Sequence, residues 1–326
     1  MTDPAGVRPE LQESHFPAAT PHEGGFPATA GATTRVPGAA GVPVPAVASD
    51  VAGPGPAPLG RLLAAEVRWV FRRPRTLVLL GVFAAVPVLI AIGVRLADRG
   101  PGRGLIGAVA GNGLVLPVAA LTLALGLLLP LAVATAAADA LAGEAAAGTL
   151  RGLLLAPVGR LRLVVMKAVG VLVVAVAAVL VIAVVGVVAG LLVVGTQDPA
   201  GGLLTLSGTT VGLGDALGRV ALVAAWTVGQ LAAVGAVALA VSAATEHPLV
   251  VLAAVLAGLI VFGVLGAIPA LDGLAPYLLT SGWSAGADAL RDPLPLDGMA
   301  SSTLRALAYT AAGAAATVAT VLRRDA

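Results

Sequence analysis

The chain has 326 residues, 58% of them hydrophobic and only 11% charged, and its mean hydropathy is +1.00. Soluble globular chains are closer to about 45–50% apolar, and the long apolar runs lack the polar stripe of a soluble helical bundle, so the composition predicts an all-α polytopic membrane protein. The lack of cysteine excludes disulfides and cysteine metal sites. There are only three histidines, two of them in the N-terminal tail, so a histidine metal centre is not expected. The net charge is +2, and the arginines are spread along the membrane edges, which argues against nucleic-acid binding.

The N-terminal residues 1–57 are rich in proline, glycine, alanine and threonine. They show neither a helical nor a strand period, so we expect a disordered cytoplasmic tail. No basic start followed by an apolar stretch is present, so a cleaved signal peptide is not expected. Residues 58–326 are predicted to form one transmembrane domain.

An amphipathic helix is predicted for residues 58–74, directly before the first apolar run. Leucines and valines share one of its faces, and Arg68 and Arg72 lie on the opposite face, which is typical of a helix at the membrane surface. Glu66 falls within the apolar face, where a carboxylate needs a basic partner or a hydrogen-bond donor. Two interpretations are open: Glu66 pairs with a neighbour such as Arg73 or extends its side chain to the membrane surface, or Glu66 docks a partner protein.

Six apolar runs reach about 20 residues, the length that crosses ~30 Å of hydrocarbon as a helix. Arginine and lysine are more numerous on the flanks that are cytoplasmic when the N-terminus is inside, eleven against six, so we expect both termini in the cytoplasm. The last run is rich in alanine, which we interpret as packing inside the bundle. The predicted spans cover residues 77–94, 114–138, 163–194, 220–244, 249–268 and 304–322.

Prolines and paired glycines interrupt the predicted spans. Pro87, Pro117 and Pro130 lie inside the first two and would kink them. Gly186 and Gly190 are about one turn apart and would let another helix approach closely, although this spacing arises easily by chance among 42 glycines.

The outer segment 269–302 contains apolar pieces that proline and glycine break before they can span a membrane. Its Tyr277 and Trp283 are residue types enriched at membrane interfaces. We expect short helices there that dip into the outer leaflet.

Ionisable residues are almost absent from the middle of the spans, which argues against a proton-coupled secondary transporter. Thr227 and Gln230 are polar candidates for lining a substrate pathway. Interhelical hydrogen bonding is the more common reason for such residues and stays open as an alternative.

A second short helix is predicted for residues 140–156, between the second and third spans, because the segment has strong helix formers and Pro157 ends it. Glu144, Gly148 and Arg151 are four and three residues apart and fall on one face. An ordinary helix at the membrane surface would show the same spacing.

Lys167 is the only lysine in the chain, and no glycine-rich loop precedes it. A phosphate-binding loop of an ATPase needs glycines that lead into Lys-Ser or Lys-Thr. This chain therefore cannot bind ATP in that way, and any ATP hydrolysis that drives it takes place on another polypeptide.

The string EAAAGTLRGLLLAPVGR, residues 144–160, followed by Lys167, resembles the signature of the type-2 ABC transporter permeases. The pre-span segment EVRWVFRRP, residues 66–74, and the basic C-terminal end also look like that family. The resemblance covers residues 58–326 and implies that the second short helix is a coupling helix that touches a cytosolic ATP-binding subunit. The implied coupling residues are Glu144, Gly148, Thr149, Arg151, Pro157 and Arg160.

The resemblance further implies that Glu66, Arg68 and Arg72 of the interfacial helix lie against the same subunit, and that the outer segment forms a gate. It implies two ATP-binding subunits and a second permease copy, with a homodimer favoured, all surrounded by membrane lipid. ATP and magnesium (Mg) would be bound by the partner. We expect no catalytic residue, cofactor, metal or nucleic acid on this chain.

The function that follows is the permease of an ATP-driven exporter in a bacterial plasma membrane, and not an enzyme. The scarcity of charge in the spans favours a lipophilic or amphipathic substrate. Two alternatives remain open: a non-transport assembly or sensing protein, and a secondary transporter without an ATPase.

Overall fold

A computed structural model of the chain describes residues 74–97, 104–146, 160–196 and 202–323, and three further positions, Gly60, Arg68 and Arg72. All of them lie within the unit 53–326. Gly60, Arg68 and Arg72 are helical and exposed. The predicted tail 1–57 and the rest of the interfacial helix, including Glu66, lie outside the described residues.

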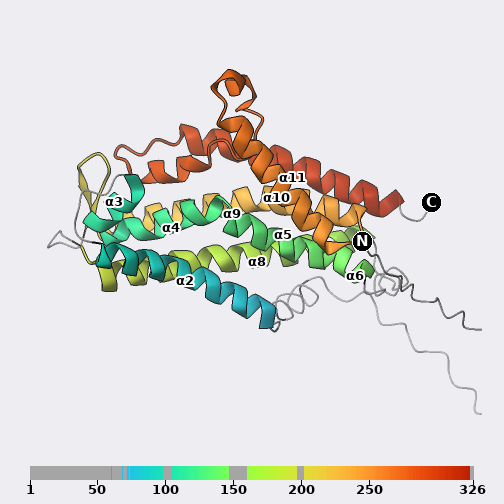
Figure 1. Cartoon of the computed structure of the whole chain (residues 1–326), viewed down its shortest axis with the longest axis horizontal. Helices are drawn as coiled ribbons and strands as arrows, with labels where there is room; N and C mark the ends of the chain where they lie inside the picture. Colours follow the sequence, from blue (N-terminus) through green and yellow to red (C-terminus); the bar gives the residue numbers. More distant parts are fainter. Residues whose placement is uncertain are drawn as a thin grey trace, which may run out of the picture. The chain divides into compact units, whose positions relative to one another are not determined.

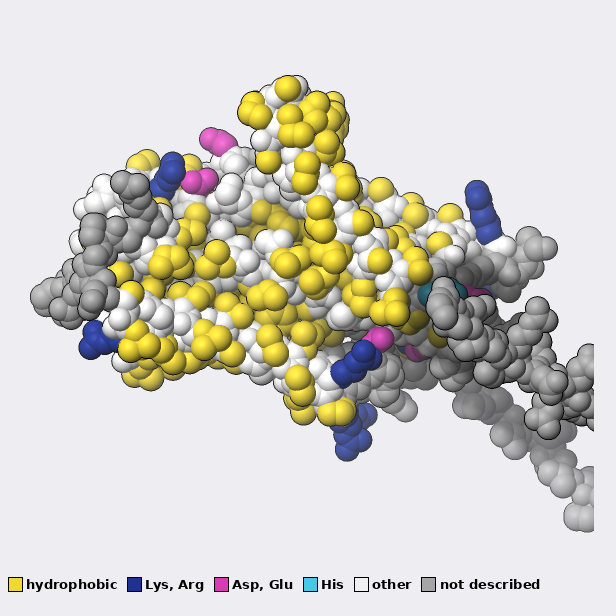
Figure 2. Space-filling model, in the orientation of Figure 1, with side chains coloured by type: hydrophobic (Ala, Val, Ile, Leu, Met, Phe, Trp, Pro, Cys, Tyr) yellow, Lys and Arg dark blue, Asp and Glu magenta, His cyan; other side chains and the backbone are white. Residues whose placement is uncertain are grey.

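The described part of the chain contains six helices that are long and apolar enough to cross a membrane. The prediction of an all-α polytopic membrane protein is therefore confirmed. Figure 1 shows these helices running side by side, and Figure 2 shows hydrophobic side chains over the middle of one face with charged side chains toward its two ends. The spans are α2 (Pro74–Leu96), α5 with α6 (Leu128–Ala146), α8 with η2 (Arg160–Val194), α9 (Leu213–Ala244), α10 (Pro248–Gly266) and α11 (Asp297–Arg323).

The second predicted span, 114–138, is wrong as a single helix, because the chain breaks at Gly126 and Leu127 between α4 and α5. Pro130 explains the break, since it has no N–H to donate to the carbonyl of Gly126 and its ring clashes there. Pro117 instead lies in the first turn of α4, and Pro87 sits inside a continuous α2. The pieces are α3 (Gly104–Gly111), η1 (Gly113–Val115), α4 (Leu116–Leu125), α5 (Leu128–Ala140) and α6 (Ala142–Ala146).

Two glycines of the third span pack it against the broken second one. A side chain on Gly186 would come within 2.8 Å of the Pro117 backbone, and one on Gly190 would overlap the carbonyl of Gly113. The prediction that this glycine pair permits close approach is confirmed. Here α8 (Arg160–Ala189) gives way to the π-turn η2 (Gly190–Val194).

Short elements form the end of the bundle opposite α6. Strands β1 (Leu203–Leu204) and β2 (Thr210–Val211) make an antiparallel hairpin between α8 and α9, with Leu203 opposite Val211. The outer segment forms two 3-10 helices, η3 (Pro269–Leu274) and η4 (Trp283–Leu290). No residue of η3 is buried, whereas η4 packs on α4, α9 and α11. Short helices are thus present as predicted.

The core centres on α9, which packs against α5, α8 and α11. The interpretation of α11 as a helix inside the bundle is wrong, because only 17% of its most apolar stretch is buried. α11 rests on α9 by one face, where a side chain on Gly313 would come within 2.6–2.8 Å of the Ala236 and Val237 backbone. The buried stripe of α11 consists of Met299, Ser302, Ala306, Gly313 and Thr317, so most alanines of the helix lie outside this contact.

Candidate functional site

The polar junction that α6 forms with α8 and α9 lies at the end of the bundle where α11 finishes (Figure 1). Helix α5 ends at Ala140, and the backbone of Leu141 leaves helical geometry with φ −124° and ψ −55°. The chain then restarts as α6, whose first N–H groups lack partners within the helix. The Ala142 N–H donates to the Ser242 hydroxyl on α9 over 3.0 Å, and Ser242 is fully buried.

A buried ion pair joins α6 to α8. The Lys167 ammonium lies 2.5 Å from Oε1 of Glu144, and the two side chains are 7% and 17% exposed. Lys167 follows two turns inside α8, so its long side chain stays within protein and carries the charge back to α6. Removing one partner of a buried pair costs far more than removing a surface pair, because the other charge stays buried.

A second ion pair at the same end joins α2 to α5. Arg75 donates to Oδ2 of Asp139 over 3.0 Å, with side chains that are 75% and 30% exposed. Water and salt screen such a pair, so its contribution is about 0–1 kcal/mol. It is therefore a matched exposed control for the buried Lys167–Glu144 pair.

The structure places only part of the predicted coupling set. Glu144 lies in α6, and Arg160 is the exposed first residue of α8. Gly148, Thr149, Arg151 and Pro157 lie outside the described residues, so the predicted Glu144–Gly148–Arg151 face stays a prediction.

Sequence reasoning missed two residues of this junction. From the sequence, Lys167 marks only the lack of a phosphate-binding loop and the end of the string that resembles the permease signature, and nothing there pairs it with Glu144 or singles out Ser242. A lone lysine at the fifth position of a long apolar run is unusual enough to signal a buried partner. No comparable signal marks Ser242.

The pathway candidates Thr227 and Gln230 are 1% and 0% exposed on α9. The Thr227 hydroxyl and both amide atoms of Gln230 have no hydrogen-bond partner among the described residues. An interhelical hydrogen bond does form one residue away, where Nε1 of Trp226 donates to the Ser302 hydroxyl of α11 over 3.1 Å. Of the polar side chains in the middle of α9, Trp226 is therefore hydrogen-bonded to a neighbouring helix, whereas Thr227 and Gln230 are buried without a partner among the described residues.

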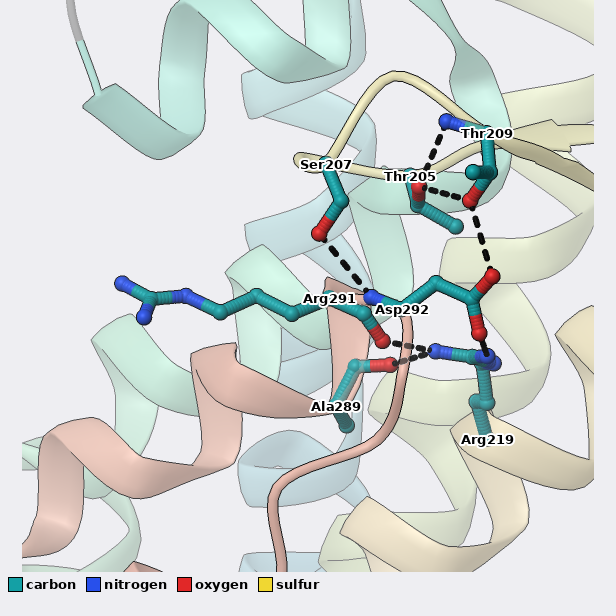
Figure 3. A network of polar contacts seen from close by, with 7 residues as sticks. All are labelled: Thr205, Ser207, Thr209, Arg219, Ala289, Arg291 and Asp292. Carbon is teal, nitrogen blue, oxygen red and sulfur yellow. Dashed lines mark hydrogen bonds and ion pairs between the residues drawn. The ribbon is translucent and has the colours of Figure 1, made fainter.

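At the opposite end of the bundle, Arg219 of α9 binds the end of η4 and the residues that follow it (Figure 3). Its guanidinium donates to the carbonyls of Ala289 and Arg291 and lies 3.2 Å from Oδ1 of Asp292. The Thr209 hydroxyl donates to the other oxygen of Asp292 over 3.0 Å, as Figure 3 shows. This network latches the β1–β2 hairpin to the segment that follows η4.

The fold and the junction together define a multi-pass membrane protein in which a short helix at the end of the second span is tied to the third and fourth spans. Residues 62–240 match the family described as ABC-2 family transporter protein, which is more than half of the chain. The chain therefore belongs to the ABC-2 transporter family. No curated protein matches the chain significantly.

Family membership makes the protein a membrane subunit of an ABC transporter, and such a subunit works with an ATP-binding cassette subunit. The matched residues run from the predicted interfacial helix to α9 and include the junction at α6. Helices α10 and α11 and the outer segment lie beyond the match.

Proposed function

We propose that the protein is the permease of an ATP-driven exporter and that the Lys167–Glu144 pair transmits the motion of the partner ATPase to the spans. The observation that carries this proposal is the buried ion pair, 2.5 Å long, between α6 and α8. α6 leads directly into the predicted coupling residues. A push on that segment reaches α8 through the ion pair and α9 through Ser242.

The partner in this proposal is a pair of cytosolic ATP-binding cassette subunits that carry ATP and magnesium. Gly148, Thr149, Arg151, Pro157 and Arg160 are proposed to contact them. Glu66, Arg68 and Arg72 of the interfacial helix are proposed to contact the same subunits. Arg68, Arg72 and Arg160 are exposed, as a contact with a cytosolic subunit requires.

A second copy of the permease is proposed to face the broken second span. Gly126 and Leu127 interrupt the helix between ten residues of α4 and thirteen of α5, and both are exposed. Irregular backbone facing hydrocarbon costs several kcal/mol for each unsatisfied group, and it is tolerated against protein or a water-filled cavity. The break therefore supports protein or the pathway at this face, and the proposed occupant is a second permease copy.

Thr227 and Gln230 are proposed to line the pathway in another conformation of the transporter. Burying an amide without a hydrogen bond costs about 1–3 kcal/mol on protein scales. A conformation in which the spans part and water or cargo reaches Gln230 would recover that cost. The scarcity of charge in the spans supports a lipophilic or amphipathic cargo.

Reconstitution with the partner subunits in liposomes tests the coupling role. The variants are Lys167→Met and Glu144→Gln, with Arg75→Gln as the matched exposed control. We expect the first two to lower cargo export per ATP hydrolysed at least tenfold and the control to leave it unchanged. Full export and full cargo-stimulated ATPase in Lys167→Met would overturn the coupling role.

The same preparation separates the alternative functions. Export that requires both ATP and the partner subunits supports the function as an ATP-driven exporter. Movement driven by an ion gradient in liposomes without the partner would identify a secondary transporter. Stable association with the partner without movement of any lipophilic cargo would identify an assembly or sensing protein.

A further inference from the structure

Arg305 lies farther inside its helix than the hydropathy of the sequence indicates. Helix α11 begins at Asp297, seven residues before the predicted span 304–322, so Arg305 is the ninth residue of the helix. Each helical residue advances 1.5 Å, which places Arg305 about 12 Å from the start of α11. An ionisable side chain this far inside a span is costly and marks a functional site by default.

The register between α9 and α11 fixes the level of Arg305 in the bundle. Nε1 of Trp226 donates to the hydroxyl of Ser302, which lies 76 positions further along the chain. The contact of Gly313 with the backbone of α9 has the same register within one residue. The two helices therefore run in the same direction, and Arg305 lies level with Gly229. That level is about 5 Å from the middle of the fourth predicted span.

The guanidinium of Arg305 occupies a notch in the segment between η3 and η4. Its Nη2 donates to the carbonyl of Ser281. Gly282 has a φ of 91°, and a side chain there would come within 2.6 Å of the same nitrogen. The Tyr309 hydroxyl, one turn further along α11, donates to the carbonyl of Tyr277 in the same segment over 2.8 Å. The segment is therefore shaped around a guanidinium and held against α11.

The positive charge of Arg305 has no counter-ion among the described residues. None of the described acids forms an ion pair with it, whereas Arg219 and Arg291 pair with Asp292 and Asp288 at the end of the bundle. The Nε atom of Arg305 is buried and also has no hydrogen-bond partner in the described part of the chain. A guanidinium carries five N–H donors and no acceptor. The group that this notch lacks is therefore an acceptor with negative charge.

Three other buried side chains at this level have unused hydrogen-bonding groups. Thr227 and Gln230 lie on either side of the level on α9, and Trp283 follows the glycine of the notch in η4. A side chain on Gly286, in the same short helix as Trp283, would come within 3.0 Å of Trp226. The Thr227 hydroxyl, the Gln230 amide and Nε1 of Trp283 have no partner among the described residues. Together with the guanidinium they form a polar layer in the middle of the bundle.

We propose that Arg305 binds the anionic headgroup of an amphipathic cargo, a carboxylate or phosphate that carries a hydrocarbon tail. Hydrogen bonds from arginine to such groups are charge-assisted and are among the strongest in proteins. Leu304 and Leu307 of the same helix are 71% and 61% exposed, so a tail can lie on apolar surface while its headgroup reaches the guanidinium. The proposal rests on the proposed exporter function and narrows its substrate class to anionic amphiphiles.

The test is binding of a charged probe and its neutral counterpart to the full-length permease in phosphatidylcholine nanodiscs. The probes are 5-doxylstearate, in a buffer alkaline enough to ionise its carboxyl group, and the methyl ester of the same acid. Their nitroxide quenches the fluorescence of Trp226 and Trp283, and Trp69→Phe removes the third tryptophan of the chain. Wild type should bind the carboxylate about tenfold more tightly than the ester, the lower end of what a charge-assisted hydrogen bond contributes.

The variants separate recognition of the charge from support of the notch. Arg305→Gln should abolish the preference for the carboxylate, and Arg305→Lys, which keeps the charge, should retain part of it. The control is Arg291→Gln, which removes a 60% exposed arginine that pairs with Asp288, and it should keep the full preference. A damaged notch would weaken the binding of both probes alike, so the ratio of the two affinities reports the charge alone.

Three results would overturn the proposal. They are equal binding of both probes by wild type, a preference that survives Arg305→Gln, and an equal loss of both probes in that variant. In liposomes with the partner subunits, 5-doxylstearate should stimulate the ATPase more than its ester does. Equal stimulation in a complex that exports another lipophilic cargo would assign the site to a resident anionic lipid and refute the role in cargo binding. Because binding is measured without ATP or partner, it stays readable if the complex exports nothing, and failure of the exporter function is thereby distinguished.

Discussion

Replacing Lys167 with methionine is the sharpest test of the junction between α6 and α8. The substitution keeps an unbranched side chain of similar length and removes the positive charge that faces Glu144. We expect α6 to lose its ionic tie to α8 while the Ala142–Ser242 hydrogen bond remains. The first consequence is a fall in the free energy of unfolding.

The magnitude follows from the burial of the pair. The Lys167 and Glu144 side chains are 7% and 17% exposed, so the carboxylate cannot exchange its partner for full hydration. Breaking a buried pair at one partner costs about 3–5 kcal/mol, and the residual exposure of Glu144 places the expected loss near the lower bound. Removing both charges, with Glu144→Gln added, should restore about 1–3 kcal/mol of that loss, as expected for contacting residues in a double-mutant cycle.

The assay is reversible unfolding in mixed micelles, followed by tryptophan fluorescence, for the four corners of the Lys167 and Glu144 cycle. Arg75→Gln serves as the exposed control, with an expected loss of about 0–1 kcal/mol. A loss below about 1 kcal/mol for Lys167→Met, or an additive cycle, would refute the reasoning. The Lys167–Glu144 pair would then stabilise the fold no more than a surface ion pair does, and it would not hold α6 to α8.

Three further predictions concern other parts of the bundle. Gly190→Ala should destabilise the protein by about 1–3 kcal/mol, because its methyl group would overlap the carbonyl of Gly113 and force η2 away from η1; unfolding in mixed micelles measures this, and an unchanged stability would show that the two segments part freely. Gln230→Leu should raise stability by about 1–3 kcal/mol, because it removes a buried amide without partners among the described residues. It should also change the relative export of different cargos if the residue lines the pathway. A less stable variant would mean that the amide is hydrogen-bonded in the folded protein. Arg219→Met should speed amide hydrogen exchange around Asp292 at least tenfold, because it removes the donors that join α9 to the Ala289 and Arg291 carbonyls and to the Asp292 carboxylate. Unchanged exchange would show that the contacts of Thr209 and Ser207 with Asp292 suffice to hold the segment.

The sequence was most informative where the signal is local. Hydropathy over about 20 residues predicted six spans and placed five of them, because a spanning helix must satisfy every backbone group internally and is therefore one long apolar run. The second predicted span is instead divided between α4 and α5, and the crossing helix there is Leu128–Ala146. Pro130 also predicted where the second span is irregular, but it did not predict whether the helix bends or stops there. A proline three residues into a span can kink a continuous helix or start a new one, and the exposed Gly126 and Leu127 show that α5 starts anew.

The candidate site was visible from the sequence only in part. Glu144 stood out because its spacing from Gly148 and Arg151 places the three on one helix face, which suggested Arg151 as a companion. Its partner in the described residues is Lys167, 23 positions further along the chain. Helical periodicity relates residues within one helix, and it carries no information about which residue of the next span reaches back.

The sequence by itself determined the class of protein: an all-α membrane protein with six spans and no nucleotide-binding loop of its own. These properties follow from hydropathy and from the residues that phosphate binding requires, both of which can be read along the chain. Only the tertiary structure decided that Lys167 is buried against Glu144, that Gly186 and Gly190 seat the third span on the second, and that Arg305 of α11 lies level with the middle of α9. Those features depend on how closely helices approach one another, which small side chains permit but do not specify until all the neighbours are in place.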